Sequence, residues 1–228
     1  MKFYISNNEL DTQITEIRRK IRLSMNGIVS DQMKISGINY KQNFGVSIPR
    51  LKEIACDYKP NHDLCQRLWA LKIRETMILS TLLQPVEKLT LELAIMRIKE
   101  IDQMEMVEQM CMNLLCKMQQ PGELVLMLIR SDNLWQQITG FMLVVRVYNQ
   151  LADSELASVL ERAFELSDTN EFYLYKTIGL SLSRLCRRDA ATAAFIAGNI
   201  KSQFVSGSVA QRYIVNEVKL EIDFLDNI

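Results

Sequence analysis

The scarcity of helix-breaking residues is the strongest constraint on the fold of this chain. Its 228 residues include only eight glycines and four prolines. Most of these stand where a stretch of helical periodicity begins or ends. Between them apolar residues recur three and four positions apart, and no segment alternates apolar and polar residues between turn glycines. The sequence therefore predicts an all-α protein with essentially no sheet.

Several helix starts can be placed from capping signals. Ser47 is a predicted N-cap two residues before Pro49, and Asn61 is predicted to cap the next helix. A break is expected near Leu71 or Lys72. Further helices are predicted to open at Pro85, after Gly122, at Ser131 or Asp132, at Asp153, and at Thr169 or Asn170. The last of these is expected to bury Phe172, Ile178, Leu182 and Leu185.

Many amphipathic helices of ordinary length, joined by short loops, suit stacked helix pairs better than a small bundle. Each pair of HEAT or armadillo type buries its apolar face on its neighbours and leaves a concave face. The hydrophobic fraction of 48% is sufficient for such an interior. We predict an α-α superhelix, a concave solenoid formed by one domain over residues 1–228. An irregular globular bundle is the alternative.

Composition excludes several classes of protein. The 27 Lys and Arg balance 27 Asp and Glu, so a DNA-binding face would require the charges to be segregated on the surface. Five cysteines without a CxxC pair, and a single histidine, offer no metal spacing, and no cofactor is expected. Free thiols, the lack of a signal peptide and the lack of a membrane span predict a cytoplasmic protein. We expect it to be a monomer. No Ser–His or Cys–His arrangement and no phosphate-binding glycine loop points to another hydrolase.

Three stretches occur in an order that goes beyond general helix composition. They are "FGVSIPRLKEIA" (44–55), "LWALKIRETMILSTLL" (68–83) and "SDNLWQQITGFMLVVRVY" (131–148). A fourth, "NEFYLYKTIGLSLSRL" (170–185), follows them. Together these blocks resemble the DNA alkylation repair enzymes, the AlkD-type DNA glycosylases built from HEAT-like repeats. The resemblance covers most of the chain and implies the same helical-repeat fold.

The resemblance also implies an activity. Active members of this family grip duplex DNA by its backbone in a concave basic face and remove N3- or N7-alkylated purines. The alkylated base is already cationic and leaves without an acid, so an oxocarbenium-like sugar develops, as in glycoside hydrolysis. A carboxylate and electron-rich aromatic faces stabilise that cation. The family does not need the deep pocket for a flipped base that most glycosylases use.

The residues that the resemblance places in the cleft are partly replaced. Active members carry a tryptophan and, four residues later, an aspartate, and the matching positions are Met104 and Glu108. Leu180 stands where a second tryptophan is expected, and Ile138 stands where an arginine is expected. Glu108 is therefore the predicted catalytic residue, with a solvated helix residue as the alternative. The neighbouring methionines at 104, 106, 110 and 112 are interpreted as core packing.

Basic residues at five positions are the predicted DNA contacts. They are Arg50, Lys52, Arg146, Lys176 and Arg184. Arg146 matches a basic, backbone-contacting position of the family. Arg187 and Arg188 extend the last cluster, and the run Arg18, Arg19, Lys20, Arg22 is either a phosphate-binding strip or the solvated face of the first helix. Trp69 and Trp135 are interpreted as packing residues, and His62 as exposed and without a role.

Three functions remain open at this point. The first is a DNA glycosylase that acts on cationic alkylpurines through Glu108. The second is a protein that binds duplex DNA without catalysis. The third is a helical-repeat scaffold for protein partners, which the neutral total charge and the missing aromatic residues would suit.

Overall fold

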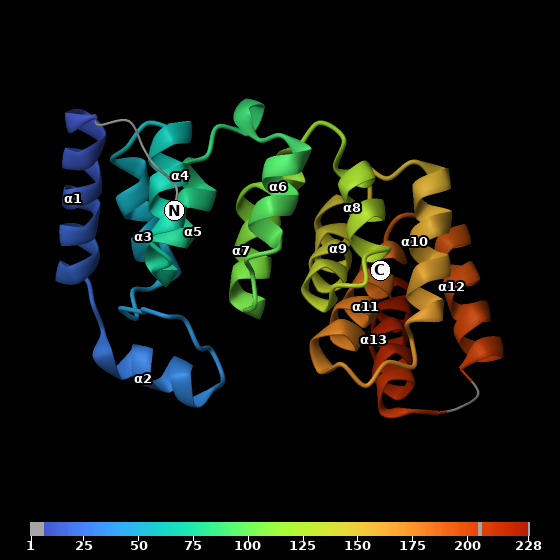
Figure 1. The fold of residues 1–228 in the computed structure, drawn as a ribbon. Coiled ribbons are helices and arrows are strands. Elements are labelled where there is room, and N and C mark those ends of the chain that lie inside the picture. The colour runs from blue at the N-terminus through green and yellow to red at the C-terminus, as the bar shows by residue number, and fades with distance from the viewer. Residues whose placement is uncertain (1–6, 205–206, 228) are drawn as a thin grey trace. The chain divides into compact units, whose positions relative to one another are not determined.

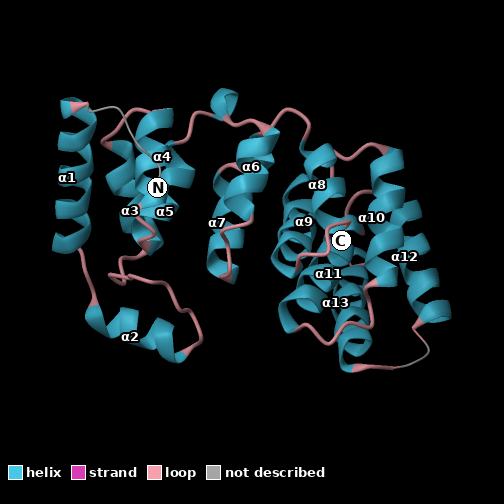
Figure 2. Ribbon diagram, viewed as in Figure 1, coloured by secondary structure: helices cyan, strands magenta, loops and turns pink. Residues whose placement is uncertain are grey.

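The computed structural model describes residues 7–204 and 207–227 of the chain. Helices make up nearly all of the regular structure in these ranges, and the described residues form no strand (Figures 1 and 2). One isolated bridge joins Gln42 to Ile73. The all-α prediction is confirmed. The chain divides into two compact units, Met1–Thr90 and Leu91–Ile228.

The first unit is organised around one buried helix. Its elements are α1 (Asn8–Leu23), α2 (Gly27–Ile35), α3 (Ile48–Cys56), α4 (His62–Ala70), α5 (Arg74–Leu83) and a 3-10 turn, η1 (Val86–Lys88). Nearly all of α5 is buried, and it packs on α3 and α4. The α1 helix covers α3 and α4 with its apolar face, which consists of Leu10, Ile17 and Ile21.

The predicted caps of the first unit are confirmed. The Ser47 side chain accepts a hydrogen bond from the Arg50 amide at 3.4 Å, and Asn61 accepts one from the Leu64 amide at 2.9 Å. These bonds satisfy amides that a helix start otherwise leaves without a partner. The predicted break is also present, because α4 ends at Ala70 and Lys72 has a φ of 55°.

A buried ion pair fastens the loop before α3 to α5. The Arg74 guanidinium donates to Val46 O at 2.8 Å and to the Glu75 carboxylate at 3.0 Å. The same Glu75 oxygen accepts the backbone amides of Phe44 at 3.1 Å and Val46 at 3.3 Å. Gly45, between them, has a φ of 68°, and a Cβ there would lie 2.1 Å from the Asn26 carbonyl oxygen. The loop conformation therefore depends on both the carboxylate and this glycine.

The second unit contains the remaining helices. They are α6 (Leu91–Ile98), α7 (Met104–Asn113), the 3-10 turn η2 (Leu115–Lys117), α8 (Pro121–Ile129), α9 (Leu134–Val147), α10 (Asp153–Glu165), α11 (Phe172–Leu185), α12 (Ala190–Gln203) and α13 (Val209–Leu225). The mostly buried α9 packs on α7, α8 and α11, and α11 packs on α13 (Figure 1). Gly140 lets α8 and α9 approach closely, since a Cβ there would lie 2.7 Å from Ile129.

Several predicted helix boundaries in the second half need correction. Asn133, and neither Ser131 nor Asp132, caps α9, by accepting the Gln136 amide at 3.0 Å. The Ser131 hydroxyl is instead engaged with the Gln136 side chain at 2.5 Å. Helix α11 begins at Phe172 rather than at Thr169 or Asn170.

Two proline predictions differ from the structure as well. Pro85 opens only the short turn η1, and a break before α6 follows it. Helix α8 begins at Pro121, before Gly122, because a proline at the first helical position lacks only an amide that has no helical partner. The predicted start at Asp153 is confirmed.

Free thiols are confirmed for all five cysteines. Cys65, Cys111 and Cys186 are buried, Cys116 is partly buried and Cys56 is exposed. Within the described ranges, no helix has both the length and the apolar character that crossing a membrane requires.

Candidate nucleic-acid interface

The predicted catalytic residue lies at the surface of α7, beside a predicted DNA contact on α9. Glu108 is solvent-exposed in the second turn of α7, and Arg146 is exposed in the last turn of α9. Partial burial of the carboxyl group and the charge of Glu105 raise the pKa of Glu108, and the charge of Arg146 opposes that rise. The structure thus brings Glu108 and Arg146 close enough for their charges to interact.

The other face of α7 is ordinary core. Met106 and Met110 are buried as predicted, whereas Met104 is half-buried at the first residue of the helix. Cys111 lies among these buried residues, and its thiol is fully desolvated, which raises its pKa. Met104 and Glu108 are one helical turn apart, so they share a face. At the position that the resemblance predicts for a tryptophan, the Met104 side chain offers a thioether and no π face.

The other two replaced positions differ from each other in exposure. Ile138 is 0% exposed within α9, so its side chain contacts the core. Leu180 is half-buried on α11 and still reaches the surface. An arginine in place of Ile138 would place an unpaired charge in this core, so the position cannot serve as a cleft residue in this chain.

A stripe of α11 faces solvent. Phe172, Lys176, Leu180 and Arg184 recur every four residues, and each is partly or largely exposed. Phe172 is 50% exposed, contrary to its predicted burial, because α11 begins only at this residue. The Lys176 ammonium lies 4.6 Å from the centre of the Phe172 ring and 5.5 Å from that of Tyr213. The two predicted DNA contacts of α11 therefore share one helix face.

Arg187 and Arg188, next along the chain, have structural partners. Arg187 forms an ion pair and hydrogen bond with Glu221 of α13. Arg188 donates to the Leu151 carbonyl at 2.7 Å and to Asp153 at 2.8 Å. These contacts connect α10, α11 and α13. In the predicted basic cluster, Arg187 and Arg188 therefore have structural roles, whereas the partly exposed Arg184 can contact a ligand.

In the first unit, too, some basic residues are bonded to neighbouring side chains and others are exposed to solvent. Arg50 donates to Glu53 at 2.7 Å and to the Ser24 hydroxyl at 3.1 Å, while Lys52 is exposed. Lys20 bonds Asp57 at 3.0 Å and Glu16 at 3.2 Å, and the bond to Asp57 is the main cause of its raised pKa. Lys20 is therefore structural, whereas Arg18, Arg19 and Arg22 are exposed on α1.

The net charge is zero for the whole chain but differs between the two units. Residues 1–90 hold 14 Lys and Arg against nine Asp and Glu, and residues 91–228 hold 13 against 18. The first unit is thus basic and the second acidic by the same amount. Long-range attraction of a polyanion would come mainly from the first unit.

Three further residues were assigned minor roles from the sequence. Trp69 is buried, in agreement with its predicted packing role. Trp135 is half-buried and its ring lies against Tyr173 at 5.9 Å. The prediction that His62 is exposed is wrong: it is half-buried, and its Nδ1 lies 3.0 Å from the Gln84 side-chain nitrogen.

Comparison with known proteins identifies the family. The DNA alkylation repair enzyme family matches residues 18–206, which is most of the chain. The chain belongs to the DNA alkylation repair enzyme family. No curated protein sequence matches the chain.

A solved structure gives the fold of this family member. The solved protein is described as a member of "a new family of proteins related to the HEAT-like repeat DNA glycosylases with affinity for branched DNA structures". The TM-score is 0.73 at 13% sequence identity, and the match covers 82% of this chain and 81% of that chain. The predicted HEAT-like helical-repeat fold is confirmed at this level.

Proposed function

We propose that this member of the DNA alkylation repair family binds duplex DNA through its backbone. The observation that carries the proposal is the set of exposed or half-exposed basic side chains at the predicted positions. Arg146 on α9 and Lys176 and Arg184 on α11 belong to the second unit, and Arg50 and Lys52 on α3 belong to the basic first unit. Each can reach a phosphate without leaving a buried partner unpaired.

The family membership supports this assignment, and so does the solved relative, which is described as having affinity for branched DNA structures. Binding by phosphate contacts releases counterions, so the affinity should fall steeply with salt. Fluorescence anisotropy with a labelled duplex at increasing salt tests the proposal. Salt-sensitive binding to undamaged duplex supports it. No binding even at low salt would reject it and would favour the protein-scaffold alternative.

Release of cationic alkylpurines is a second candidate function, and the exposed Glu108 carboxylate beside Arg146 favours it. In this mechanism the cationic base takes the electron pair of the glycosidic bond and leaves as a neutral alkylpurine. The positive charge develops on the sugar, and the carboxylate stabilises this oxocarbenium-like species until water adds to it. Met104 and Leu180 supply no π face, and each missing cation–π contact removes about 1–2 kcal/mol of stabilisation. Release is therefore expected to be slow.

The second candidate has its own test. Release of 7-methylguanine and 3-methyladenine from methylated duplex is measured with the wild type and Glu108→Gln, and binding is followed in parallel. Loss of release at unchanged affinity would support Glu108 as the catalytic carboxylate. Equal release from both proteins would reject that role, and binding without any release would leave a non-catalytic DNA-binding protein.

A further inference from the structure

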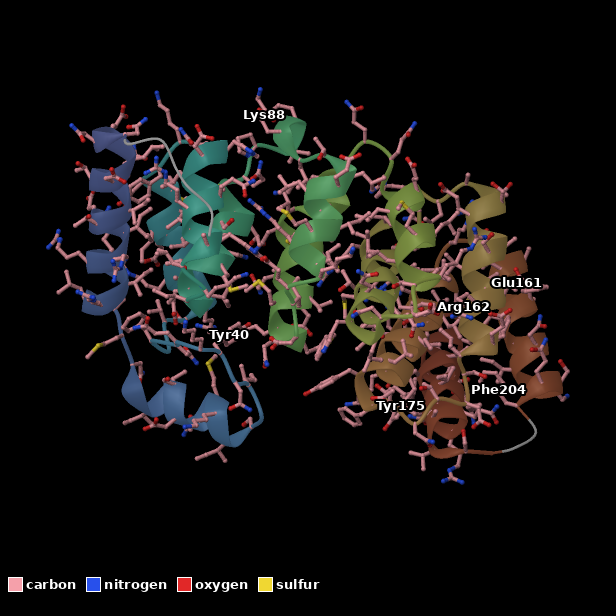
Figure 3. All side chains as sticks on the ribbon, in the orientation of Figure 1. Tyr40, Lys88, Glu161, Arg162, Tyr175 and Phe204 are labelled. Carbon is pink, nitrogen blue, oxygen red and sulfur yellow. The ribbon has the colours of Figure 1, made fainter. Side chains whose placement is uncertain are left out.

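Five aromatic side chains from three helices of the second unit form a continuous chain of ring contacts. Trp135 of α9 lies 5.9 Å from Tyr173 of α11, which lies 5.3 Å from Phe172, measured between ring centres. Phe172 lies 5.6 Å from Tyr175, and Tyr175 lies 5.5 Å from Tyr213 of α13. Tyr175, in the middle of this series, is labelled in Figure 3. These distances fall in the range of attractive aromatic pairs.

The outer members of this chain are not part of the core. Phe172 is 50% exposed and Tyr173 is 40% exposed, and Trp135 is half-buried. Tyr175 is nearly buried and forms the base on which the outer rings rest. By contrast, Phe141 in the middle of α9 is completely buried. Large aromatic side chains held in place yet open to solvent are typical of binding surfaces.

The charges around the rings favour an anionic ligand at one position. The Lys176 ammonium lies over the Phe172 ring at 4.6 Å. Glu217 lies beside the Tyr213 phenol, and burial together with this carboxylate raises the pKa of that phenol to about 12. Glu171, the exposed residue before α11, makes no capping hydrogen bond with its side chain. Arg212, also exposed, donates to Gly207 O at 2.7 Å. Lys176 is thus the cation placed directly against the exposed rings.

We propose that Trp135, Phe172, Tyr173 and Lys176 form a stacking surface for unpaired nucleobases of DNA. The parts of the Phe172 and Tyr173 rings that are open to solvent can stack with a base. Lys176, which lies over the Phe172 ring, binds a neighbouring phosphate. Within an intact duplex the faces of the bases are covered by their neighbours, so only an unpaired stretch can use these rings. Stacking of this kind tolerates any base, since every base has a π face. The inference rests on the proposed DNA binding and extends it from the backbone to the bases.

The test compares two single-stranded probes of equal length and charge. One is a labelled thymidine 12-mer, and the other is an abasic 12-mer with the same phosphates and no bases. The wild type is expected to bind the thymidine probe at least about fivefold more tightly, the lower end of the effect of stacking one base. Phe172→Ala combined with Tyr173→Ala should remove this preference and leave the affinity for the abasic probe unchanged.

Three control variants separate stacking from other effects. Phe195→Ala removes another exposed aromatic, on α12 outside the ring chain, and should keep the preference. Phe172→Leu combined with Tyr173→Leu keeps apolar bulk without π faces, and should lose most of the preference. Lys176→Gln should weaken binding of both probes and flatten the salt dependence. Circular dichroism of each variant checks that the helices remain folded.

Equal wild-type affinity for the two probes would overturn the stacking surface, as would a preference that survives the double alanine variant. A stronger affinity for a uridine 12-mer of RNA than for the thymidine probe would overturn the assignment to DNA. These failures are distinct from failure of the proposed function, because duplex affinity and its salt dependence are measured on intact duplex. If the protein binds duplex DNA but does not distinguish the two probes, the proposed function is supported and the stacking surface is refuted.

Discussion

Replacing Arg146 by glutamine is expected to flatten the salt dependence of DNA binding by a calculable amount. Arg146 is exposed in the last turn of α9 and can contact one phosphate. Each phosphate contact contributes about 0.9 to the slope of log affinity against log salt. Loss of the Arg146 contact should therefore make the slope less negative by about 0.9, whatever the number of other contacts. Between about 50 and 200 mM salt the variant should lose roughly 3.5-fold less affinity than the wild type.

The matched control is Arg187→Gln. This arginine lies in the turn after α11 and is ion-paired with Glu221, so its loss should lower stability and leave the slope unchanged. Fluorescence anisotropy on one labelled duplex over the salt range measures both variants. The reasoning is wrong if Arg146→Gln keeps the wild-type slope, or if Arg187→Gln reduces the slope by as much.

Three other predictions concern the stability and reactivity of the fold. Glu75→Ala leaves buried amides and Arg74 without this carboxylate and should cost roughly 3–5 kcal/mol in urea unfolding, whereas a loss below about 1 kcal/mol would contradict the role of the ion pair. Because the pKa of Glu108 is raised in the folded state, its ionisation lowers stability at neutral pH, and this loss is recovered as the pH falls through the raised pKa. Glu108→Gln should remove that gain from melting curves recorded at a series of acidic pH values; an unchanged pH dependence would refute the shift. Thiol labelling of the folded protein should modify the exposed Cys56 before the buried Cys111, and the opposite order would argue against the described core.

Local signals predicted much of the fold. Ser47 and Asn61 are caps that act within three residues, so the sequence was sufficient to place them. Before α9, the three consecutive residues Ser131, Asp132 and Asn133 are all of types that can cap a helix. The sequence does not distinguish them, and in the structure Asn133 is the N-cap. The ion pair of Arg74 and Glu75 was not predicted, because its partners at Phe44 and Val46 are about thirty residues away in sequence.

The candidate interface was predicted less completely than the fold. The structure places Arg146 and Glu108 at the surface with their charges interacting, while their roles in DNA binding and catalysis stay predictions. Arg187 forms an ion pair with Glu221 of α13, whereas Arg184 does not form this ion pair. The position of Glu221 cannot be predicted from the local sequence around the two arginines. The aromatic chain joins residues 135, 172–175 and 213 through the packing of three helices. Its main sequence signal was the aromatic run "FYLY", of which helical periodicity assigned Phe172 to the core.

Binding of methylated duplex DNA by the wild type and Glu108→Gln, at low and high salt with released bases collected from the same samples, tests the central claim most directly. The account predicts that both proteins bind, with equal affinity and the same steep loss of affinity at high salt. Any base release should come from the wild type alone. Absence of binding by either protein at low salt would contradict the account.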